Sequence, residues 1–242
     1  MFTIIQVKNY EELSKEAFKI MKQVVTSNSQ PVIGLATGSS PIGLYQKMVQ
    51  DHKENGTSYQ NVVTFNLDEY VGLRKDHSES YYSFMNTHLF SALDVQKENI
   101  HIPVGNSDDL DKECCAYEKA MADYQLDIQL LGIGSNGHIG FNEPGTSFDT
   151  TTHIVTLKET TREDNARFFI PLNEEVPTKA ITMGIASIMK AKKILMVASG
   201  AGKADAIVKM MNGPITMELP ASVLQNHPDV IVIVDEAAAS KL

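Results

Sequence analysis

The chain of 242 residues has no tryptophan and only two cysteines. Cys114 and Cys115 are adjacent, so they cannot form a disulfide that joins distant segments, and a disulfide-stabilised secreted domain is excluded. The sequence also lacks the run of about 18 apolar residues that a membrane-spanning helix needs, and its first residues lack the basic segment of a secretory signal. We therefore expect a cytoplasmic protein with no membrane partner.

Positive charge is also scarce in this sequence. Lys and Arg number 21 against 30 Asp and Glu, which gives a formal net charge of −9. Such a surface repels a phosphate backbone at long range, so no nucleic-acid partner is expected. The seven histidines are scattered without the spacing of metal ligands, and no metal site is predicted. No G-x-S-x-G segment is present, which argues against a serine hydrolase with that nucleophile turn.

The residues that are present predict a folded α/β protein. Short runs rich in β-branched residues end at Gly, Asn or Asp and lead into helical patterns, as buried parallel strands do. These runs cover residues 32–35, 62–66, 128–133, 154–157, 180–183, 194–198 and 230–234. Helices are expected over residues 10–26, from Pro41 onward, and over residues 113–124, 160–169 and 203–211.

Neither an internal repeat nor a linker divides the chain, so one domain over residues 1–242 is expected. The predicted fold is a single-domain, doubly wound, Rossmann-like α/β fold. It has a mostly parallel sheet of about seven strands, with helices on both faces. Ligands of such folds bind beyond the carboxyl ends of the strands, and the segments that follow the predicted strands are therefore the candidate functional segments.

A small, hydroxyl-rich turn (TGSSP, residues 37–41) lies between the predicted strand 32–35 and the helix that begins at Pro41. Unpaired amides at a helix N-terminus and nearby hydroxyl groups together form a site for an anion. The amides of this turn and the hydroxyl groups of Thr37, Ser39 and Ser40 are therefore predicted to bind a monophosphate. An ordinary βα turn capped by serine is the alternative.

Two adjacent acids, Asp68 and Glu69, follow the predicted strand 62–66. Neighbouring residues of an extended segment point to opposite faces, so one acid is expected to enter the cleft while the other supports the scaffold. A desolvated carboxylate in the cleft can act as a general base for a carbon acid. Capping of the following turn is the alternative role.

A glycine-rich loop follows the predicted strand 128–133. Gly132, Gly134 and Gly137 match the G-x-G-x-x-G pattern of dinucleotide-binding proteins. That pattern must open a helix, however, and the glycines and proline at residues 140–145 break one. We therefore predict a loop that folds back on itself.

The polar residues of this loop are Asn136, His138 and Glu143. Glu143 hydrogen-bonded to the imidazole would fix the tautomer of His138 and support proton transfer near neutral pH. A purely structural histidine is the alternative.

Two basic residues are placed to close on an anion. Arg167 lies in the predicted helix 160–169, and Lys203 follows the turn SGAG after a predicted strand. The turn is not a Walker A loop, because Val197 replaces its first glycine and Ala204 replaces the hydroxyl residue after the lysine. Arg167 can bind phosphate through two hydrogen bonds and Lys203 as a point charge, although either residue alone can equally be a solvated surface charge.

Six segments occur in a characteristic order: LATGSSPIGLY, TFNLDEYVGL, SESYYSFM, LLGIGSNGHIGFNEPGTSF, TRxxNARFF and SGAGKA. Together they resemble the glucosamine-6-phosphate deaminases of the glucosamine/galactosamine-6-phosphate isomerase family, from about residue 32 to residue 235. The NLDEY and GHIGFNEP stretches are highly specific. The turn at residues 37–41, called the phosphate turn below, and the SGAG turn before Lys203 are shared more loosely with 6-phosphogluconolactonase and other sugar-phosphate proteins.

The resemblance implies an enzyme of amino-sugar catabolism that needs no cofactor. It would isomerise and deaminate its small-molecule substrate, glucosamine 6-phosphate, to fructose 6-phosphate and ammonia. Asp68 would move a proton from C2 to C1. His138, oriented by Glu143 with Asn136 beside it, would move the proton that opens the sugar ring.

The resemblance also places the phosphate group of the substrate. It would lie on the turn at Gly38, Ser39 and Ser40, with Arg167 and Lys203 closing on it. By analogy with the smaller assemblies of the family, we expect a monomer or a small homo-oligomer.

The chain departs from the family pattern in three ways. Some members carry Gly-Thr where this chain has Ser39 and Ser40, which is a mild change. Many members carry aspartate where this chain has Asn136, which keeps hydrogen bonding but removes a carboxylate from the proton relay. Members that an N-acetylated sugar phosphate activates carry a basic pair near His153 and Val155. This chain lacks that pair, so no such activation is expected.

Two other functions stay open at this point. A lactonase that acts on a sugar phosphate would use the phosphate turn and the histidine loop but would not need Asp68. A non-catalytic sugar-phosphate sensor would bind without turnover, although the presence of Asp68, His138 and Glu143 argues against it. Ligand-induced thermal stabilisation without ammonia release would indicate a sensor.

Overall fold

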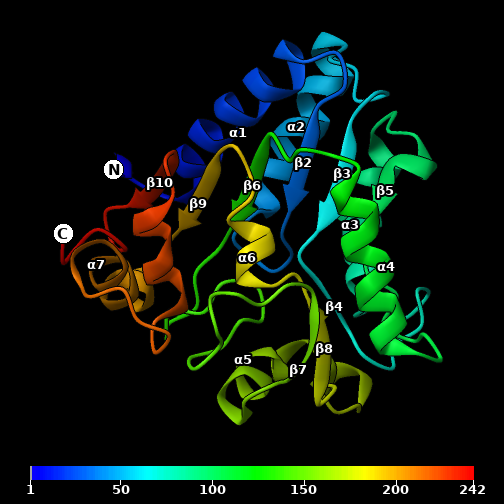
Figure 1. Ribbon diagram of the computed structural model, residues 1–242. Coiled ribbons are helices and arrows are strands. Elements are labelled where there is room, and N and C mark those ends of the chain that lie inside the picture. Colours follow the sequence, from blue (N-terminus) through cyan, green and yellow to red (C-terminus); the bar gives the residue numbers. More distant parts are fainter. Residues whose placement is uncertain (1) are drawn as a thin grey trace.

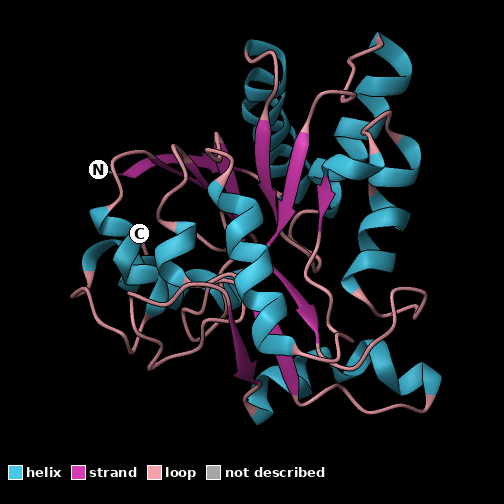
Figure 2. Ribbon diagram, turned by 45° about the vertical axis from the view of Figure 1, so that its right-hand side comes forward, coloured by secondary structure: helices cyan, strands magenta, loops and turns pink. Residues whose placement is uncertain are grey.

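The computed structural model describes residues 2–242, apart from the side chain of Asp164, and contains a seven-stranded sheet whose neighbouring strands are all parallel. The strand order is β1-β10-β9-β6-β2-β3-β5. The strands are β1 (Phe2–Val7), β2 (Val32–Leu35), β3 (Val63–Asn66), β5 (Ile100–His101), β6 (Ile128–Leu131), β9 (Ile194–Ala198) and β10 (Val230–Asp235). Figure 2 shows these strands side by side with helices around them.

The helices lie between the strands along the chain (Figure 1). The α-helices are α1 (Tyr10–Ser27), α2 (Ile42–Asn55), α3 (Tyr81–His88), α4 (Leu110–Ala122), α5 (Glu159–Phe169), α6 (Ile185–Ile188) and α7 (Ala204–Asn212). Short 3-10 helices are η1 (Phe90–Ala92), η2 (Lys97–Asn99), η3 (Ile170–Leu172), η4 (Ala201–Lys203) and η5 (Pro220–Asn226). Among the helices of the described residues, none has the length and apolar composition needed to cross a bilayer.

The strand order confirms the doubly wound α/β fold. From β2 the chain moves outward to β3 and β5. It then returns to β6 on the other side of β2 and moves outward to β9 and β10, which lies beside the edge strand β1 from the start of the chain. The direction of winding therefore changes between β2 and β6, where an open α/β sheet forms its ligand crevice. Every residue of β2, β3, β6 and β9 is buried, so the middle of the sheet is covered on both faces.

A second sheet corrects the expectation that all seven predicted strands join one parallel sheet. The runs at 154–157 and 180–183 form β7 (His153–Thr156) and β8 (Lys179–Thr182), which pair antiparallel with each other. Strand β4 (Asp68–Tyr70) pairs with β8, and Figure 1 shows this small sheet with α5 below the main one. None of the four residues of β7 is buried, unlike those of a central parallel strand.

Two strands of the main sheet, β1 and β5, were not predicted from the sequence. Strand β1 lies at the sheet edge and is largely exposed, so it lacks a continuous apolar run, and β5 has only two residues. Helix starts were easier to predict. Asn9 Oδ1 accepts from the Glu12 amide at 3.0 Å and caps α1. Helix α4, by contrast, begins at Leu110, three residues before its predicted start, and Asp109 caps it.

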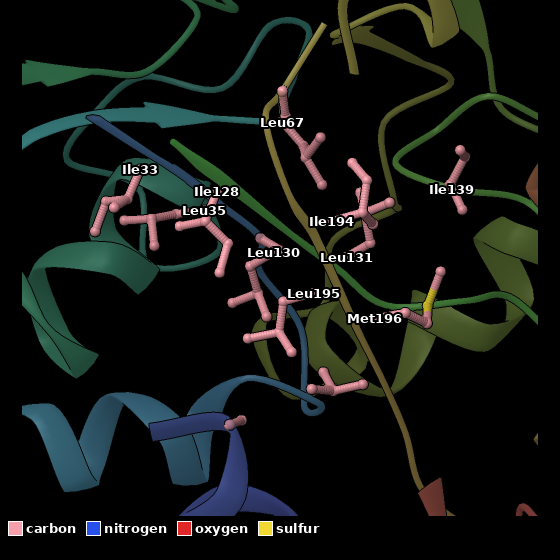
Figure 3. Close-up of a cluster of buried hydrophobic side chains, with 14 of the residues drawn as sticks. Ile33, Leu35, Leu67, Ile128, Leu130, Leu131, Ile139, Ile194, Leu195 and Met196 are labelled. Atoms are coloured by element: carbon pink, nitrogen blue, oxygen red, sulfur yellow. The ribbon is translucent and has the colours of Figure 1, made fainter. Parts of the chain in front are cut away.

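The main hydrophobic core lies against the parallel sheet. Figure 3 shows its aliphatic side chains, among them Leu35, Leu130 and Leu195, all of which are fully buried. A second, smaller cluster supports the antiparallel sheet and α5, and it contains Tyr70, Phe141, Leu157, Phe169, Val176 and Ala180. This second cluster holds α5 beside the loops that follow the main strands.

Candidate active site

A cavity of about 450 Å³ opens at the carboxyl ends of the central strands, where the winding of the sheet changes direction. Its volume suits a small metabolite such as a sugar phosphate. Seven of the nine predicted site residues line it: Gly38, Ser39, Ser40, Asp68, His138, Arg167 and Lys203. Among the described residues, the lining does not include Asn136 and Glu143, which adjoin the cavity through their contacts with His138.

The turn after β2 is held in place by two tyrosine hydroxyl groups. Tyr10 Oη donates to the carbonyls of Ser39 and Ser40, at 2.9 and 3.1 Å, and accepts from the Gly43 amide at 2.8 Å. Tyr45 Oη donates to the Ala36 carbonyl at 2.5 Å. Because these bonds hold carbonyls of the turn, they fix its shape next to the start of α2, where backbone amides point toward an anion.

The backbone of this turn also explains its glycine. Gly38 has a φ of +86°, which is strained for residues with a Cβ atom, and a Cβ there would meet nothing within 4 Å. The glycine therefore serves the backbone conformation of the turn.

Asp68 and Glu69 divide their roles as strand alternation predicts. The buried Asp68 lines the cavity, while Glu69 accepts hydrogen bonds from the amides of Tyr70, Tyr81 and Tyr82, at 2.8, 2.9 and 3.0 Å. Glu69 thereby caps the first turn of α3.

Burial changes the pKa of Asp68, the acid that lines the cavity. It raises the pKa of Asp68 to about 8, and the negative charge of Glu69 adds to this effect. A carboxyl group with such a pKa can both take and return a proton near neutral pH. Burial also raises the pKa of Glu69, although the three amides that it accepts from oppose the shift.

The glycine loop brings the imidazole of His138 close to the backbone. A Cβ atom at Gly134 would lie 2.4 Å from Nδ1 and Cε1 of His138, so the ring occupies the space that a side chain would need. The Gly134 amide donates to the His138 carbonyl at 2.9 Å, and Gly137 has a left-handed φ of +85°. The loop therefore folds back on itself rather than opening a helix, as its glycines and proline predict.

Glu143 lies next to the imidazole and is only 4% exposed. Its Oε2 is 3.7 Å from His138 Nδ1, an ion-pair contact that is longer than the hydrogen bond predicted between them. The same oxygen accepts from Asn136 Nδ2 at 2.8 Å. Its Oε1 accepts a short hydrogen bond from the Thr161 hydroxyl on α5. Asn136 Oδ1 in turn accepts from the His138 amide at 3.2 Å, so the three predicted polar residues of the loop form one connected group.

Two basic side chains reach the cavity from different elements. Arg167 projects from α5 with its guanidinium carbon 4.7 Å from the centre of the Phe168 ring. Lys203 ends η4 after the turn at Gly200, whose φ is +91°. Asp235, at the end of β10, accepts from the Ser199 hydroxyl at 2.5 Å and from the Gly200 amide at 3.0 Å.

The structure adds lining residues that the sequence analysis did not single out, notably Tyr81, Thr161, Asn165 and Phe168. Three of them share a helical spacing of i, i+4 and i+7 on α5, a signal that was present in the sequence. Tyr81 begins α3 and lies in the SESYYSFM segment, but no spacing distinguished it from the other residues of that segment. In the described part of the chain, no group of three His, Cys, Asp or Glu side chains has the arrangement of a metal site.

Residues 7–232 match the model of the family described as glucosamine-6-phosphate isomerases/6-phosphogluconolactonase. The chain belongs to this family. Within it, the protein is similar to the glucosamine-6-phosphate deaminase of Geobacillus sp. (strain WCH70), with 52% identity over 98% of this chain and 94% of the relative. The glucosamine-6-phosphate deaminase of Streptococcus thermophilus (strain ATCC BAA-491 / LMD-9) is 53% identical over 98% of this chain and 99% of that protein.

Solved structures of the family agree with this similarity. A monomeric glucosamine-6-phosphate deaminase superposes with a TM-score of 0.96 at 46% identity, over 99% of this chain and all of that one. The 6-phosphogluconolactonase of Trypanosoma brucei superposes with a TM-score of 0.82 at 19% identity, over 100% of this chain and 99% of that one, which is a likeness of fold. The isomerase/lactonase family thus shares one architecture, and the deaminases are far more similar to this chain in sequence.

Proposed function

We propose that this protein is a glucosamine-6-phosphate deaminase, which converts glucosamine 6-phosphate and water into fructose 6-phosphate and ammonia in amino-sugar catabolism. One observation supports this above the others: Asp68 and His138 line the same cavity as the turn after β2 and the two basic side chains. A proton-transfer acid, an imidazole and an anion site therefore face one small ligand. The similarity to deaminases over nearly the full chain, at 52% and 53% sequence identity, supports glucosamine 6-phosphate as the substrate.

The phosphate anchors the substrate in this proposal. Gly38, Ser39 and Ser40 offer amides and hydroxyl groups beside the start of α2, and Arg167 and Lys203 supply positive charge from the other side. The chain carries a formal net charge of −9, so a dianion needs such a local concentration of donors. The anchor leaves the hexose ring between Asp68 and His138.

Ring opening comes first in the proposed reaction. His138 takes the proton of the anomeric hydroxyl and delivers a proton to the ring oxygen, while the bond between C1 and the ring oxygen breaks. Glu143, beside Nδ1, stabilises the imidazolium that forms in between, and the amide of Asn136 holds the carboxylate in position. The product of this step is the open-chain aldehyde.

Asp68 then takes the proton from C2 and returns it at C1 through an enolamine. The aldehyde oxygen gains a proton that the C2 ammonium gives up, so C1 becomes a hydroxymethyl group and C2 an iminium carbon. Water adds to C2, and the carbinolamine releases ammonia to leave the ketone. Isomerisation must precede loss of ammonia, because an amine leaves readily from the C2 carbinolamine but poorly from C2 of the aldose. None of these steps requires a cofactor.

The proposal is tested by incubating the purified protein with glucosamine 6-phosphate and measuring ammonia and fructose 6-phosphate in the same sample. The two products are expected in equimolar amounts. Hydrolysis of 6-phosphogluconolactone without ammonia release would instead indicate the lactonase alternative. Thermal stabilisation by glucosamine 6-phosphate with neither product would indicate a sugar-phosphate sensor.

The proposed enzyme acts in the cytoplasm on a small-molecule substrate, with no nucleic-acid or membrane partner. Its two free thiols, the buried Cys114 and the exposed Cys115, support a reducing compartment. The similarity to a solved deaminase described as monomeric supports a monomer or a small homo-oligomer. Light scattering of the purified protein measures this state directly.

A further inference from the structure

Thr161 joins helix α5 to the imidazole relay. It is buried, lines the cavity, and donates its hydroxyl hydrogen to Oε1 of Glu143. The other oxygen of Glu143 accepts from Asn136 and lies beside His138 Nδ1. Each oxygen of this buried carboxylate therefore has its own donor, one from the glycine loop and one from α5.

The same helix carries the arginine of the phosphate site. Arg167 lies six residues after Thr161, within the 11 residues of α5, and both side chains line the cavity. Phe169 anchors the end of the helix: it is buried and its ring centre is 5.7 Å from that of Tyr70. Since both side chains belong to this 11-residue helix, an anion held by Arg167 would also restrain the position of the Thr161 hydroxyl.

We propose that Thr161 is a positioning residue that couples binding of the 6-phosphate group at Arg167 to the orientation of Glu143 toward His138. This proposal rests on the proposed deaminase function. With the phosphate bound, the hydroxyl of Thr161 holds the carboxylate beside Nδ1 of His138 for the ring-opening proton transfer. Without the hydroxyl, Oε1 loses its donor and the carboxylate can rotate away from the imidazole.

The first test compares Thr161→Val, which removes the hydroxyl at nearly constant volume, with Thr161→Ser, which keeps it. Thr161→Val is expected to lower kcat by about ten- to a hundred-fold with KM within about two-fold, since a charged hydrogen bond away from the phosphate is lost. Thr161→Ser is expected to restore most of the rate. The matched control is Thr160→Val on the same helix, because Thr160 is exposed and its activity should equal that of the wild type.

The second test separates coupling from a merely structural role. Unphosphorylated glucosamine is supplied with and without added phosphite dianion, which can occupy the phosphate site independently of the sugar. Phosphite is expected to accelerate deamination by the wild type and by Thr160→Val, and to lose most of this effect in Thr161→Val. Thr161→Ala serves as a second variant if Thr161→Val does not fold.

Three results would overturn the coupling. The first is a kcat of Thr161→Val equal to that of the wild type. The second is a fall in kcat of Thr160→Val as large as that of Thr161→Val. The third is an acceleration by phosphite that is absent in the wild type or unchanged in Thr161→Val. Failure of the deaminase proposal is distinguishable, because the wild type would then release no ammonia from glucosamine 6-phosphate itself.

Discussion

The side-chain amide of Asn136 donates a 2.8 Å hydrogen bond to Oε2 of Glu143, the same oxygen that lies 3.7 Å from Nδ1 of His138. An aspartate at the half-buried position 136 would instead place a second carboxyl group within hydrogen-bond distance of the buried Glu143. The asparagine therefore removes a charge conflict from the relay while it keeps a donor for Glu143.

The first prediction concerns this pair. In Asn136→Asp, repulsion by Glu143 raises the folded pKa of the new carboxyl group above its unfolded value of about 4. A raised folded pKa of an acid means that ionisation opposes folding. Relative to the wild type, the variant is therefore expected to lose stability as the pH rises from about 4 to 8, and to be nearly unaffected below about pH 4.

Thermal unfolding midpoints across this pH range measure the effect. Ser135→Asp is the matched control, because it adds the same charge one residue away at an exposed position. A stability difference between Asn136→Asp and the wild type that stays constant with pH would contradict the prediction.

The second prediction concerns the pH dependence set by Asp68. Its pKa of about 8 implies that kcat/KM rises with pH through this region, because the base must be ionised to take the C2 proton. Glu69→Gln removes the neighbouring negative charge, which disfavours the ionised form of Asp68. The acidic limb of the profile is therefore expected to move to lower pH.

The pH profile of ammonia release under kcat/KM conditions checks this shift. Glu79→Gln is a suitable control, because it neutralises a partly buried carboxylate ten residues away that does not contribute to the raised pKa of Asp68. If the acidic limbs of Glu69→Gln and the wild type coincide, the electrostatic account of Asp68 is wrong.

The third prediction concerns the turn that presents Lys203. Asp235 accepts from the Gly200 amide at 3.0 Å, from the Ser199 hydroxyl at 2.5 Å and from the Ala238 amide at 2.8 Å, and these bonds lower its pKa against the effect of burial. Asp235→Asn weakens these charge-assisted bonds and loosens the turn before Lys203. KM for glucosamine 6-phosphate is expected to rise about ten-fold, with kcat changed much less.

Steady-state kinetics and competition by inorganic phosphate measure this effect on the anion site. Glu236→Gln, at the exposed neighbouring position, should leave both parameters unchanged. A selective fall in kcat of Asp235→Asn, with KM and phosphate inhibition as in the wild type, would show that the turn does not serve phosphate binding.

Site residues that follow parallel strands were predictable, because a buried strand and the segment directly after it can both be recognised from a short stretch of sequence. The phosphate turn, Asp68 and the glycine loop each follow a buried β-branched run, and a doubly wound sheet brings such segments to one edge. This rule accounts for six of the seven predicted residues that line the cavity, and the seventh, Arg167, lies on α5 instead.

Long-range pairing limited the rest of the prediction. The small antiparallel sheet depends on the register of β4 and β7 against β8, and a short apolar run does not specify its partner or direction. The contact between Thr161 and Glu143 joins segments 18 residues apart and arises only when that sheet places α5 over the glycine loop. The i, i+4, i+7 spacing on α5 indicated a face but not what the face contacts.

The most direct measurement compares the wild type with Asp68→Asn for conversion of glucosamine 6-phosphate, scoring ammonia and fructose 6-phosphate together and substrate binding by thermal stabilisation. The wild type should form both products in equal amounts. Asp68→Asn should still bind the substrate but lose activity by about 10²- to 10⁴-fold, the range expected for loss of a general base. A wild type that forms neither product, or an Asp68→Asn variant as fast as the wild type, would contradict the assignment of one cavity to both proton transfers.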